Sequence, residues 1–203
     1  MSKIEIHDLN ELIKQQYPIS YIKKIINDTL LLSLLVKTDY PDYKEWFLTK
    51  QVPGIYDGSR NIIVAHIEDK IIGFVSLKKD IQEKKICTFY IANNFRRNKI
   101  GYLLTHRAIE WLECEKPLIT IPSDKLGPYI KIAKKYDWIL TDIEDGLYRN
   151  NNPEVIVNGF VNTPESEEVN QKRKSLTNIW FFYNYNKLIN NLLSRKKKFL
   201  YNR

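Results

Sequence analysis

One stretch, from Lys85 to Leu112, constrains the fold more than any other part of this sequence. Its first part, Ile86–Ala92, is apolar, aromatic and β-branched over the length of a strand and contains no Gly or Pro. From Ile100 onwards the apolar residues recur at helical spacing and form one face. A short polar and basic segment, residues 93–99, separates the two patterns. The stretch therefore predicts a buried strand that passes through a tight turn into an amphipathic helix.

The predicted turn is well suited to binding an anion. The first N–H groups of a helix have no acceptor within the helix, and the helix dipole places its positive end at the same point. Arg96, Arg97 and Lys99 add full positive charges there. An ordinary strand–turn–helix connection with a solvated basic turn remains the alternative interpretation.

The string IANNFRRNKIGYLL, residues 91–104, resembles the acetyl-CoA signature of the GNAT acetyltransferase superfamily, V-x-P-x-x-[R/Q]-x-x-G-x-[G/A]-x-x-L. The signature positions that match are Ile91, Arg96, Gly101 and Leu104. Two positions depart from it, because Asn93 stands where the family has proline and Lys99 where it has its middle glycine. Glycine at that point lets the backbone approach the phosphates without a Cβ, so a lysine preserves the site only if its backbone conformation is compatible.

The resemblance implies a fold class and a cofactor. The fold would be α/β with a mixed sheet, the GNAT acyl-CoA N-acyltransferase fold, and the cofactor would be acetyl-CoA. In this family the amides of the turn hold the pyrophosphate of coenzyme A, and the end of the preceding strand pairs with the pantetheine arm. The residues that the resemblance assigns to acetyl-CoA binding are Ile91, Arg96, Arg97, Asn98, Lys99, Ile100, Gly101 and Tyr102.

The elements around this stretch follow the order of the same family. Before it, residues 61–67 and 71–77 are β-branched and flank a polar turn, which predicts a hairpin. After it we expect a strand, a helix and three short strands, at residues 117–122, 123–136, 139–141, 147–148 and 155–157. The order β–α–β–α–β–β from the key strand onwards is that of the GNAT fold, so the resemblance covers roughly residues 8–160.

The beginning of the chain is predicted to be helical. Asp8 is a candidate N-cap with Glu11 at the spacing of a capping box. Pro18 at a helix start and Ser20 as a cap precede a second segment with apolar residues at helical spacing. We therefore expect helices before the hairpin.

A loop is predicted between these helices and the hairpin. Prolines and glycines between residues 41 and 58 indicate it, and it holds Trp46 and Phe47. In the GNAT family this region forms one wall of the acceptor pocket. The two aromatic residues either line that wall or anchor the core beneath the loop.

The resemblance also implies the chemistry. The family transfers an acetyl group from a thioester directly to an amine, which must lose its proton from a pKa of ~10.4 before it attacks. The departing thiolate is often protonated by the tyrosine of a pattern L-Y-x-K-x-G-F. Here Ala133 occupies that position, and Tyr129 lies one helical turn earlier on the same face. We predict that Tyr129 is the catalytic acid; the alternative is a packing residue.

No other catalytic group stands out. Glu83 is the carboxylate nearest to the key strand, and nothing assigns it the role of a base. His66 and His106 fit ordinary surface or core histidines, and three histidines with two scattered cysteines form no metal-binding pattern. We therefore expect no metal.

Composition indicates a globular protein in a reducing compartment. Of the 203 residues 43% are hydrophobic, which is enough to bury a core. The two cysteines suggest no disulfide framework, and the N-terminus is too polar for a signal peptide. No apolar run is long enough for a transmembrane segment, so we expect a cytoplasmic protein.

The end of the chain differs in composition from the rest. We place a GNAT-like acetyltransferase domain at residues 1–160, and a polar linker with a basic amphipathic helical tail at residues 161–203. Residues 170–203 carry nine Lys or Arg and no Asp or Glu. Basic residues interleaved with aromatics suit a nucleic acid and an anionic membrane surface equally well. A helix packed on the body, or on a second subunit in a homodimer, is the third interpretation.

Three functions remain open. The first is an acetyl-CoA-dependent N-acetyltransferase that acts on a primary amine of a small molecule or a protein. The second is a toxin-like enzyme of the same fold that acetylates aminoacyl-tRNA and holds the RNA with its basic tail. The third is a non-catalytic binding or regulatory module that keeps the GNAT fold.

Overall fold

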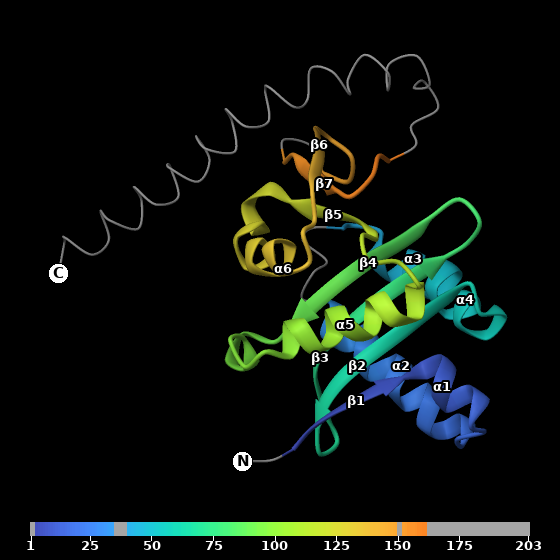
Figure 1. The fold of residues 1–203 in the computed structure, drawn as a ribbon. Helices are drawn as coiled ribbons and strands as arrows, with labels where there is room; N and C mark the ends of the chain where they lie inside the picture. Colours follow the sequence, from blue (N-terminus) through green and yellow to red (C-terminus); the bar gives the residue numbers. More distant parts are fainter. Residues whose placement is uncertain (1–2, 35–39, 150–151, 162–203) are drawn as a thin grey trace. The chain divides into compact units, whose positions relative to one another are not determined.

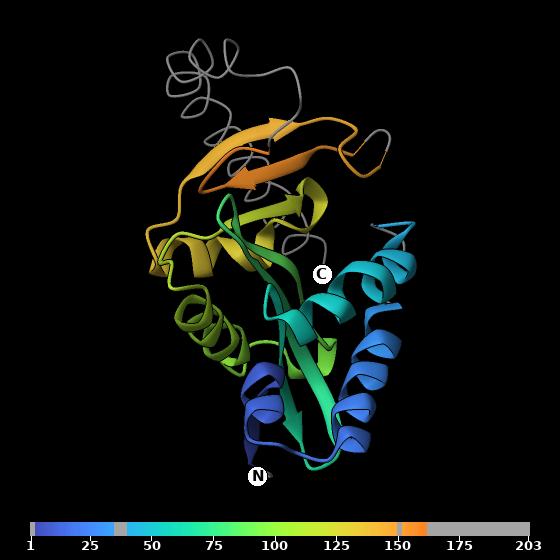
Figure 2. The same ribbon diagram turned by 90° about the vertical axis from the view of Figure 1, so that its right-hand side faces the viewer.

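The structure is a computed structural model that describes residues 3–34, 40–149 and 152–161 (Figure 1). The strands form a seven-stranded mixed sheet in the order β1-β2-β3-β4-β5-β7-β6. Helices lie on both faces of this sheet, as the side view in Figure 2 shows. The expected α/β class with a mixed sheet is confirmed, whereas the predicted basic tail lies outside the described residues.

Strands and helices make up most of the described chain. The strands are β1 (Ile4–Asp8), β2 (Arg60–Ile67), β3 (Lys70–Lys79), β4 (Lys84–Ile91), β5 (Leu118–Pro122), β6 (Leu140–Glu144) and β7 (Glu154–Val157). The α-helices are α1 (Leu9–Lys14), α2 (Ile19–Ser33), α3 (Tyr43–Trp46), α4 (Val52–Asp57), α5 (Ile100–Leu112) and α6 (Ile130–Lys135). The other helical turns are the π-helix η2 (Phe47–Gln51) and the 3₁₀ turns η3 (Asn93–Phe95), η4 (Ser123–Lys125) and η5 (Gly127–Tyr129). Within this part of the chain, no helix combines the length and the apolar character needed to cross a membrane.

Two apolar clusters pack the helices onto the sheet. The first contains the buried face of α5, including Ile100 and Leu104, and side chains of β2 to β5. The second contains Phe47 and the buried residues of α1 and α2. Ile63 of β2 belongs to the first cluster and Ile62 to the second, as the alternation of side chains along a strand requires. The sheet is therefore buried on both faces.

The sheet is antiparallel except where β4 meets β5. β2 and β3 form the predicted hairpin, and β4 pairs antiparallel with β3. β4 and β5 run parallel and are connected by α5, so the predicted order β–α–β–α–β–β is confirmed. The last strand, β7, lies between β5 and β6, an insertion that the order along the chain does not reveal.

The first element is a strand, which the prediction of a helical opening missed, whereas the two helices expected before the hairpin are present as α1 and α2. β1 pairs antiparallel with β2 at the edge of the sheet. Its alternating pattern is only five residues long and leads directly into the apolar periodicity of α1, which dominates the sequence signal. The predicted N-cap is confirmed, because the side chain of Asp8 accepts a hydrogen bond from the Glu11 N–H.

The segment between residues 41 and 58 is helical, and the predicted loop is wrong. It contains α3, η2 and α4 in immediate succession. Pro53 stands in the first turn of α4, directly after the wider turns of the π-helix η2. Gly58 ends α4 in the left-handed conformation, with φ of 80°. Gly58 therefore marks the end of this helical segment, and Pro53 lies at the passage from η2 to α4.

Three smaller predictions are also wrong. α2 begins directly after Pro18, so Ser20 lies inside the helix and does not cap it. The helix expected at residues 123–136 is divided into η4, η5 and α6, and the Gly127–Pro128 pair stands at the division. Residues 147–148 form a bend and no strand.

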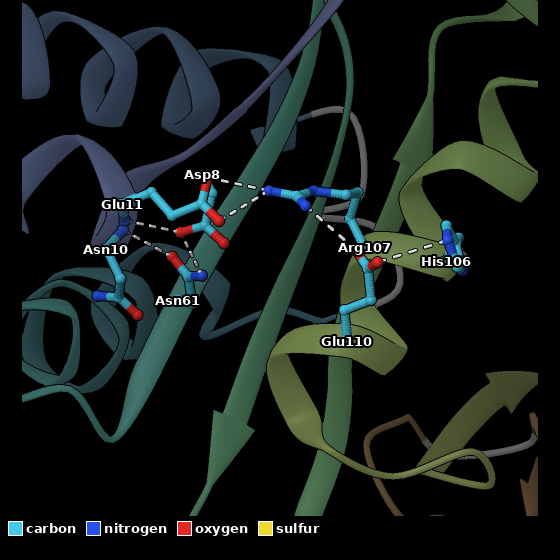
Figure 3. A network of polar contacts seen from close by, with 7 residues as sticks. All are labelled: Asp8, Asn10, Glu11, Asn61, His106, Arg107 and Glu110. Carbon is cyan, nitrogen blue, oxygen red and sulfur yellow. Dashed lines mark hydrogen bonds and ion pairs between the residues drawn. The ribbon is translucent and has the colours of Figure 1, made fainter.

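A network of polar side chains connects α1, β2 and α5 (Figure 3). Asp8 Oδ1 accepts hydrogen bonds from Asn61 Nδ2 at 2.7 Å and from the Glu11 N–H at 3.1 Å. Asn61 Oδ1 accepts the N–H of Asn10 at 3.2 Å. Arg107 Nη2, on α5, donates to both carboxylate oxygens of Glu11 at 2.9 Å. Side chains that are far apart in the sequence thus hold the first helix against the sheet.

Replacing Asp8 with alanine should destabilise the protein. The change removes the N-cap of α1 and leaves the buried amide of Asn61 without this acceptor, at a cost of about 2 kcal/mol in the free energy of unfolding. Asp8→Asn is the matched control, because its amide oxygen can accept the same hydrogen bonds. Urea unfolding of both variants measures the difference, and equal losses would contradict this role.

Comparing Asp8→Asn with the wild type at different pH values tests the effect of the charge of Asp8 on stability. Burial is the largest influence on this carboxyl and raises its pKa, against hydrogen bonds from Asn61 and the Glu11 N–H that lower it. A raised pKa means that the folded state holds the proton more tightly, so the contribution of Asp8 to stability is lost as pH rises through that pKa. Asp8→Asn should therefore gain stability relative to the wild type from acidic to neutral pH.

Candidate functional site

The candidate site begins where β4 and β5 part. The two strands share only two residue pairs, Lys85 with Leu118 and Ile86 with Ile119. Beyond these pairs β4 continues its antiparallel pairing with β3 as far as Ile91. The edge of β4 that faces away from β3 therefore has no strand partner after Ile86 among the described residues.

Main-chain groups of β4 point into this opening. Ala92 donates its N–H to β3, so the alternate residues Phe89 and Ile91 present their N–H and C=O groups to the opposite side. The Phe89 carbonyl accepts the hydroxyl of Tyr129 at 3.0 Å, and the Ile91 carbonyl accepts Arg96 Nε at 3.1 Å. No described residue accepts a hydrogen bond from the Ile91 N–H.

The turn between β4 and α5 contains a run of N–H groups that the protein does not engage. In η3 the N–H groups of Phe95 and Arg96 donate to the carbonyls of Ala92 and Asn93, at 2.9 and 3.2 Å. The N–H groups of residues 97–101 have no acceptor within the described part of the chain. They lie at the start of α5, where the helix dipole is positive. This arrangement meets the main requirement of an anion-binding turn.

Lys99 adopts a backbone conformation that glycine favours. Its φ of 62° and ψ of 2° lie in the left-handed region, and right-handed α5 begins at the next residue. An alternation of left- and right-handed residues directs successive N–H groups toward one concave point. The conformation costs a non-glycine residue about 1 kcal/mol. The lysine therefore adds a side chain to the turn and still keeps a backbone conformation suited to a glycine.

Gly101 lies close to two apolar side chains. A Cβ at this position would be 3.4 Å from Ile132 Cδ1 and 3.5 Å from Ile91 Cδ1, which is ordinary van der Waals contact. Alanine therefore fits here, in agreement with the [G/A] of the signature. A longer side chain would have to pass these two isoleucines.

Two other residues assigned to cofactor binding, Asn98 and Ile100, differ in whether their side chains can reach a ligand. Ile100 is 1% exposed and belongs to the first apolar cluster, so only its main chain can reach a ligand. Asn98 is exposed at the turn, and its side chain is accessible. The turn thus combines buried anchoring side chains with exposed polar ones.

Tyr129 reaches the open edge of β4. It ends η5 and precedes the first residue of α6. Besides its hydrogen bond to the Phe89 carbonyl, its ring packs edge-on against the Phe89 ring, with centroids 5.9 Å apart. Ala133, the position of the family's tyrosine, packs against the first apolar cluster. These contacts place the hydroxyl two residues before Ile91 along β4 and also suit the packing interpretation, so the catalytic role stays a prediction.

Lys135 adds a positive charge that the sequence analysis missed. Its Nζ lies 4.7 Å from the centroid of the Tyr102 ring, in the first turn of α5. Arg96, Arg97 and Lys99 are exposed at the same turn. No local pattern could have indicated Lys135, because the contact joins α6 to α5.

The neighbouring aromatic residues Trp46 and Phe47 differ in burial. Phe47 is completely buried in the second apolar cluster, which agrees with the core-anchor interpretation. Trp46 is half-buried, with the Arg60 guanidinium carbon 5.5 Å from its ring centroid. Only Trp46 of the two can therefore border an acceptor pocket.

Glu83 is engaged by lysines. One of its carboxylate oxygens lies 2.8 Å from Lys78 Nζ and the other 3.9 Å from Lys85 Nζ. A carboxylate held in this way is a poor candidate for a general base, as expected.

Comparison with known proteins identifies the family. A model of the Acetyltransferase (GNAT) family matches residues 19–121, just over half of the chain. Among curated proteins, no sequence matches this chain significantly.

Solved structures share the fold at low sequence identity. A putative GNAT acetyltransferase from Desulfovibrio desulfuricans is 9% identical with a TM-score of 0.55, over 76% of this chain and 97% of that one. A GNAT acetyltransferase from Streptococcus pneumoniae is 15% identical with a TM-score of 0.51, over 76% and 98%. A putative streptothricin acetyltransferase from Bacillus anthracis, in complex with acetyl coenzyme A, is 16% identical with a TM-score of 0.44. The latter match covers 51% of this chain and 64% of that one, less than two thirds of its length.

The family match and the geometry agree on the cofactor. GNAT acetyltransferases use acetyl-CoA, so the expected cofactor is confirmed at the level of the family. The N–H groups of residues 97–101 and the open edge of β4 lie within the matched segment. The chain belongs to the GNAT acetyltransferase family.

Proposed function

We propose that this protein transfers the acetyl group of acetyl-CoA to a primary amine of a small molecule or a protein. The observation that carries the proposal is the run of unengaged N–H groups at residues 97–101, beside the open edge of β4. A diphosphate offers the acceptor oxygens and the negative charge that such a run can bind. Membership of the family supports acyl transfer, and the class of acceptor is our proposal.

The donor would be held by the turn and by β4. The N–H groups of residues 97–101 would bind the pyrophosphate, with Arg96, Arg97 and Lys99 supplying positive charge around it. The free N–H of Ile91 would face the pantetheine arm and the acyl group. Bound acetyl-CoA supplies an activated acetyl group and a thiolate leaving group.

The chain's own groups would act on the reaction at two points. The Ile91 N–H would stabilise the negative charge that develops on the acyl oxygen. The hydroxyl of Tyr129, which donates to the Phe89 carbonyl, would redirect its proton to the departing sulfur. The acceptor attacks only as a neutral amine, and Glu83 is paired with Lys78, so we propose that solvent water takes the amine's proton.

Binding of the donor and the choice of acceptor separate the alternative functions. Isothermal titration calorimetry of the full chain with acetyl-CoA tests binding, and thiol release with primary amines or charged tRNA tests transfer. Saturable binding with release by amines supports the proposal. Release only with charged tRNA would favour the toxin-like enzyme, in which residues 170–203 hold the RNA. Absence of binding at millimolar acetyl-CoA would leave a non-catalytic module.

Gly101→Glu should weaken acetyl-CoA binding, and Gly101→Ala should leave it near the wild-type level. The alanine Cβ fits beside Ile132 and Ile91, whereas a glutamate places a carboxylate at the positive start of α5. Gly101→Gln is the control for size, and the Glu variant should bind about tenfold more weakly than it. Calorimetry measures the affinities and thermal unfolding verifies the fold. Equal affinities of the Glu and Gln variants would argue against an anion at this turn.

Lys99→Gly should raise stability and lower the affinity for acetyl-CoA. Glycine adopts the left-handed conformation without strain, so the free energy of unfolding should rise by about 1 kcal/mol. Lys99→Ala is the matched control, because it removes the same charge and keeps the strain. Both variants should bind the donor equally and more weakly than the wild type. If urea unfolding gives the two variants the same stability, Lys99 is not strained.

Tyr129→Phe should slow the chemical step and leave donor binding intact. Loss of a positioned acid should lower kcat about 100-fold, with KM for acetyl-CoA within about threefold of the wild type. Tyr136→Phe, at the end of α6, is a control that removes a hydroxyl from the same helix region. Steady-state thiol release measures both constants. A near wild-type kcat in Tyr129→Phe would remove the catalytic role and leave the packing role.

A further inference from the structure

Three polar residues gather at the edge of the sheet near the start of the chain, away from the strands that border the opening. β1 is the edge strand, and its register with β2 places His66 directly opposite Glu5. His7 lies two residues further along β1 and therefore on the same face as Glu5. We propose that Glu5, His7 and His66 form a binding site for a divalent cation of the zinc type.

The distances between the ligand atoms fit one ion. His7 Nε2 and His66 Nε2 are 3.2 Å apart, and His66 Nε2 is 4.0 Å from Glu5 Oε2. One atom from each of the three residues falls within 4.8 Å of the others. Two imidazole nitrogens bound to the same tetrahedral zinc lie about 3.3 Å apart, since each Zn–N bond is about 2.0–2.1 Å long. The histidine pair already has this spacing, and only the exposed carboxylate has to move closer.

The outer nitrogens of both imidazoles have partners that orient the rings. His66 Nδ1 lies 2.7 Å from the carbonyl oxygen of Glu68. Because a carbonyl only accepts, Nδ1 carries the proton and the lone pair of Nε2 faces His7. His7 Nδ1 lies 3.1 Å from the hydroxyl of Tyr21, which can accept a hydrogen bond from it. Metal-binding histidines are held in this way in proteins, by an acceptor at the other ring nitrogen.

The chemistry of the three side chains selects the ion. Two imidazoles and one carboxylate, with a fourth position left for water, are a common ligand set for zinc, whereas magnesium requires mainly oxygen ligands. The His66 side chain is 12% exposed, so this imidazole is largely shielded from solvent. Lys3 Nζ lies 3.8 Å from Glu5 Oε1. The other carboxylate oxygen, Oε2, is the one that faces His66.

A hydrogen-bonded pair of histidines is the competing explanation. His7 could donate from Nε2 to His66 Nε2 and accept the Tyr21 hydroxyl at Nδ1, which would satisfy all of these groups without an ion. Both arrangements use the same atoms, so only a titration separates them. A bound ion would link the edge strand β1 to the end of β2. Without the ion, the antiparallel pairing of the two strands connects them.

Titration of the whole 203-residue chain, without an affinity tag, with Zn²⁺ or Co²⁺ tests the proposal, with Mg²⁺ as the negative control. We expect one ion per chain by calorimetry, a visible absorption typical of tetrahedral Co²⁺, and a saturable rise in Tm. His66→Gln and His7→Gln should each weaken binding about 100-fold, and Tyr21→Phe about tenfold through the orientation of His7. His106→Gln is the matched control, because His106 is an exposed histidine of α5 that lies 3.5 Å from Glu110.

The outcomes distinguish an ion site from a histidine pair. Binding of one ion by the wild type and by His106→Gln, and its loss in His66→Gln, supports the site. Absence of saturable binding, or equal binding by the wild type and His66→Gln, would overturn it. If the histidine variants prove unstable in the absence of metal, Glu5→Gln and Tyr21→Phe provide the same test at residues outside the pair. None of these measurements depends on acetyl transfer.

Discussion

The early end of the pairing between β4 and β5 is the constraint on which the site depends. If these parallel strands paired along their whole length, the sheet would use the main-chain groups of Phe89 and Ile91. Instead β5 continues with β7 on its other side and ends at Pro122, which has no N–H. The hydroxyl of Tyr129 donates a hydrogen bond to the Phe89 carbonyl, in place of the main-chain N–H that a neighbouring strand would have supplied. Since main-chain polar groups need partners, the remaining edge is left to water or to a ligand.

The turn that follows β4 shows how a signature can lose a glycine and keep its backbone conformation. Arg97 and Lys99 both have positive φ, at 70° and 62°, which is uncommon for residues with a side chain. Such strain persists only where the surrounding structure imposes it. Here β4 is fixed by β3 on one side of the turn, and Ile100 anchors α5 in the core on the other. The turn is therefore held at both ends, and the fold sets the direction of its N–H groups.

Local patterns predicted the elements that flank the turn after β4 better than the elements that precede the hairpin of β2 and β3. The strand, turn and helix between residues 85 and 112 were predictable because each has a clear period of its own. The helices between residues 41 and 58 were not, since Pro53 and Gly58 occur both in loops and at helix ends. β1 was missed for a related reason: a short edge strand has a weak pattern, and its identity as a strand depends on β2.

By itself, the sequence determined the basic turn between a strand and a helix and the N-cap at Asp8, because both depend on residues that are neighbours along the chain. Only the tertiary structure decided which distant side chains meet. His7 faces His66 because of the register of two strands, and Tyr129 reaches β4 because its parallel partner has ended. Register and packing are set by the whole core, and no local period encodes them.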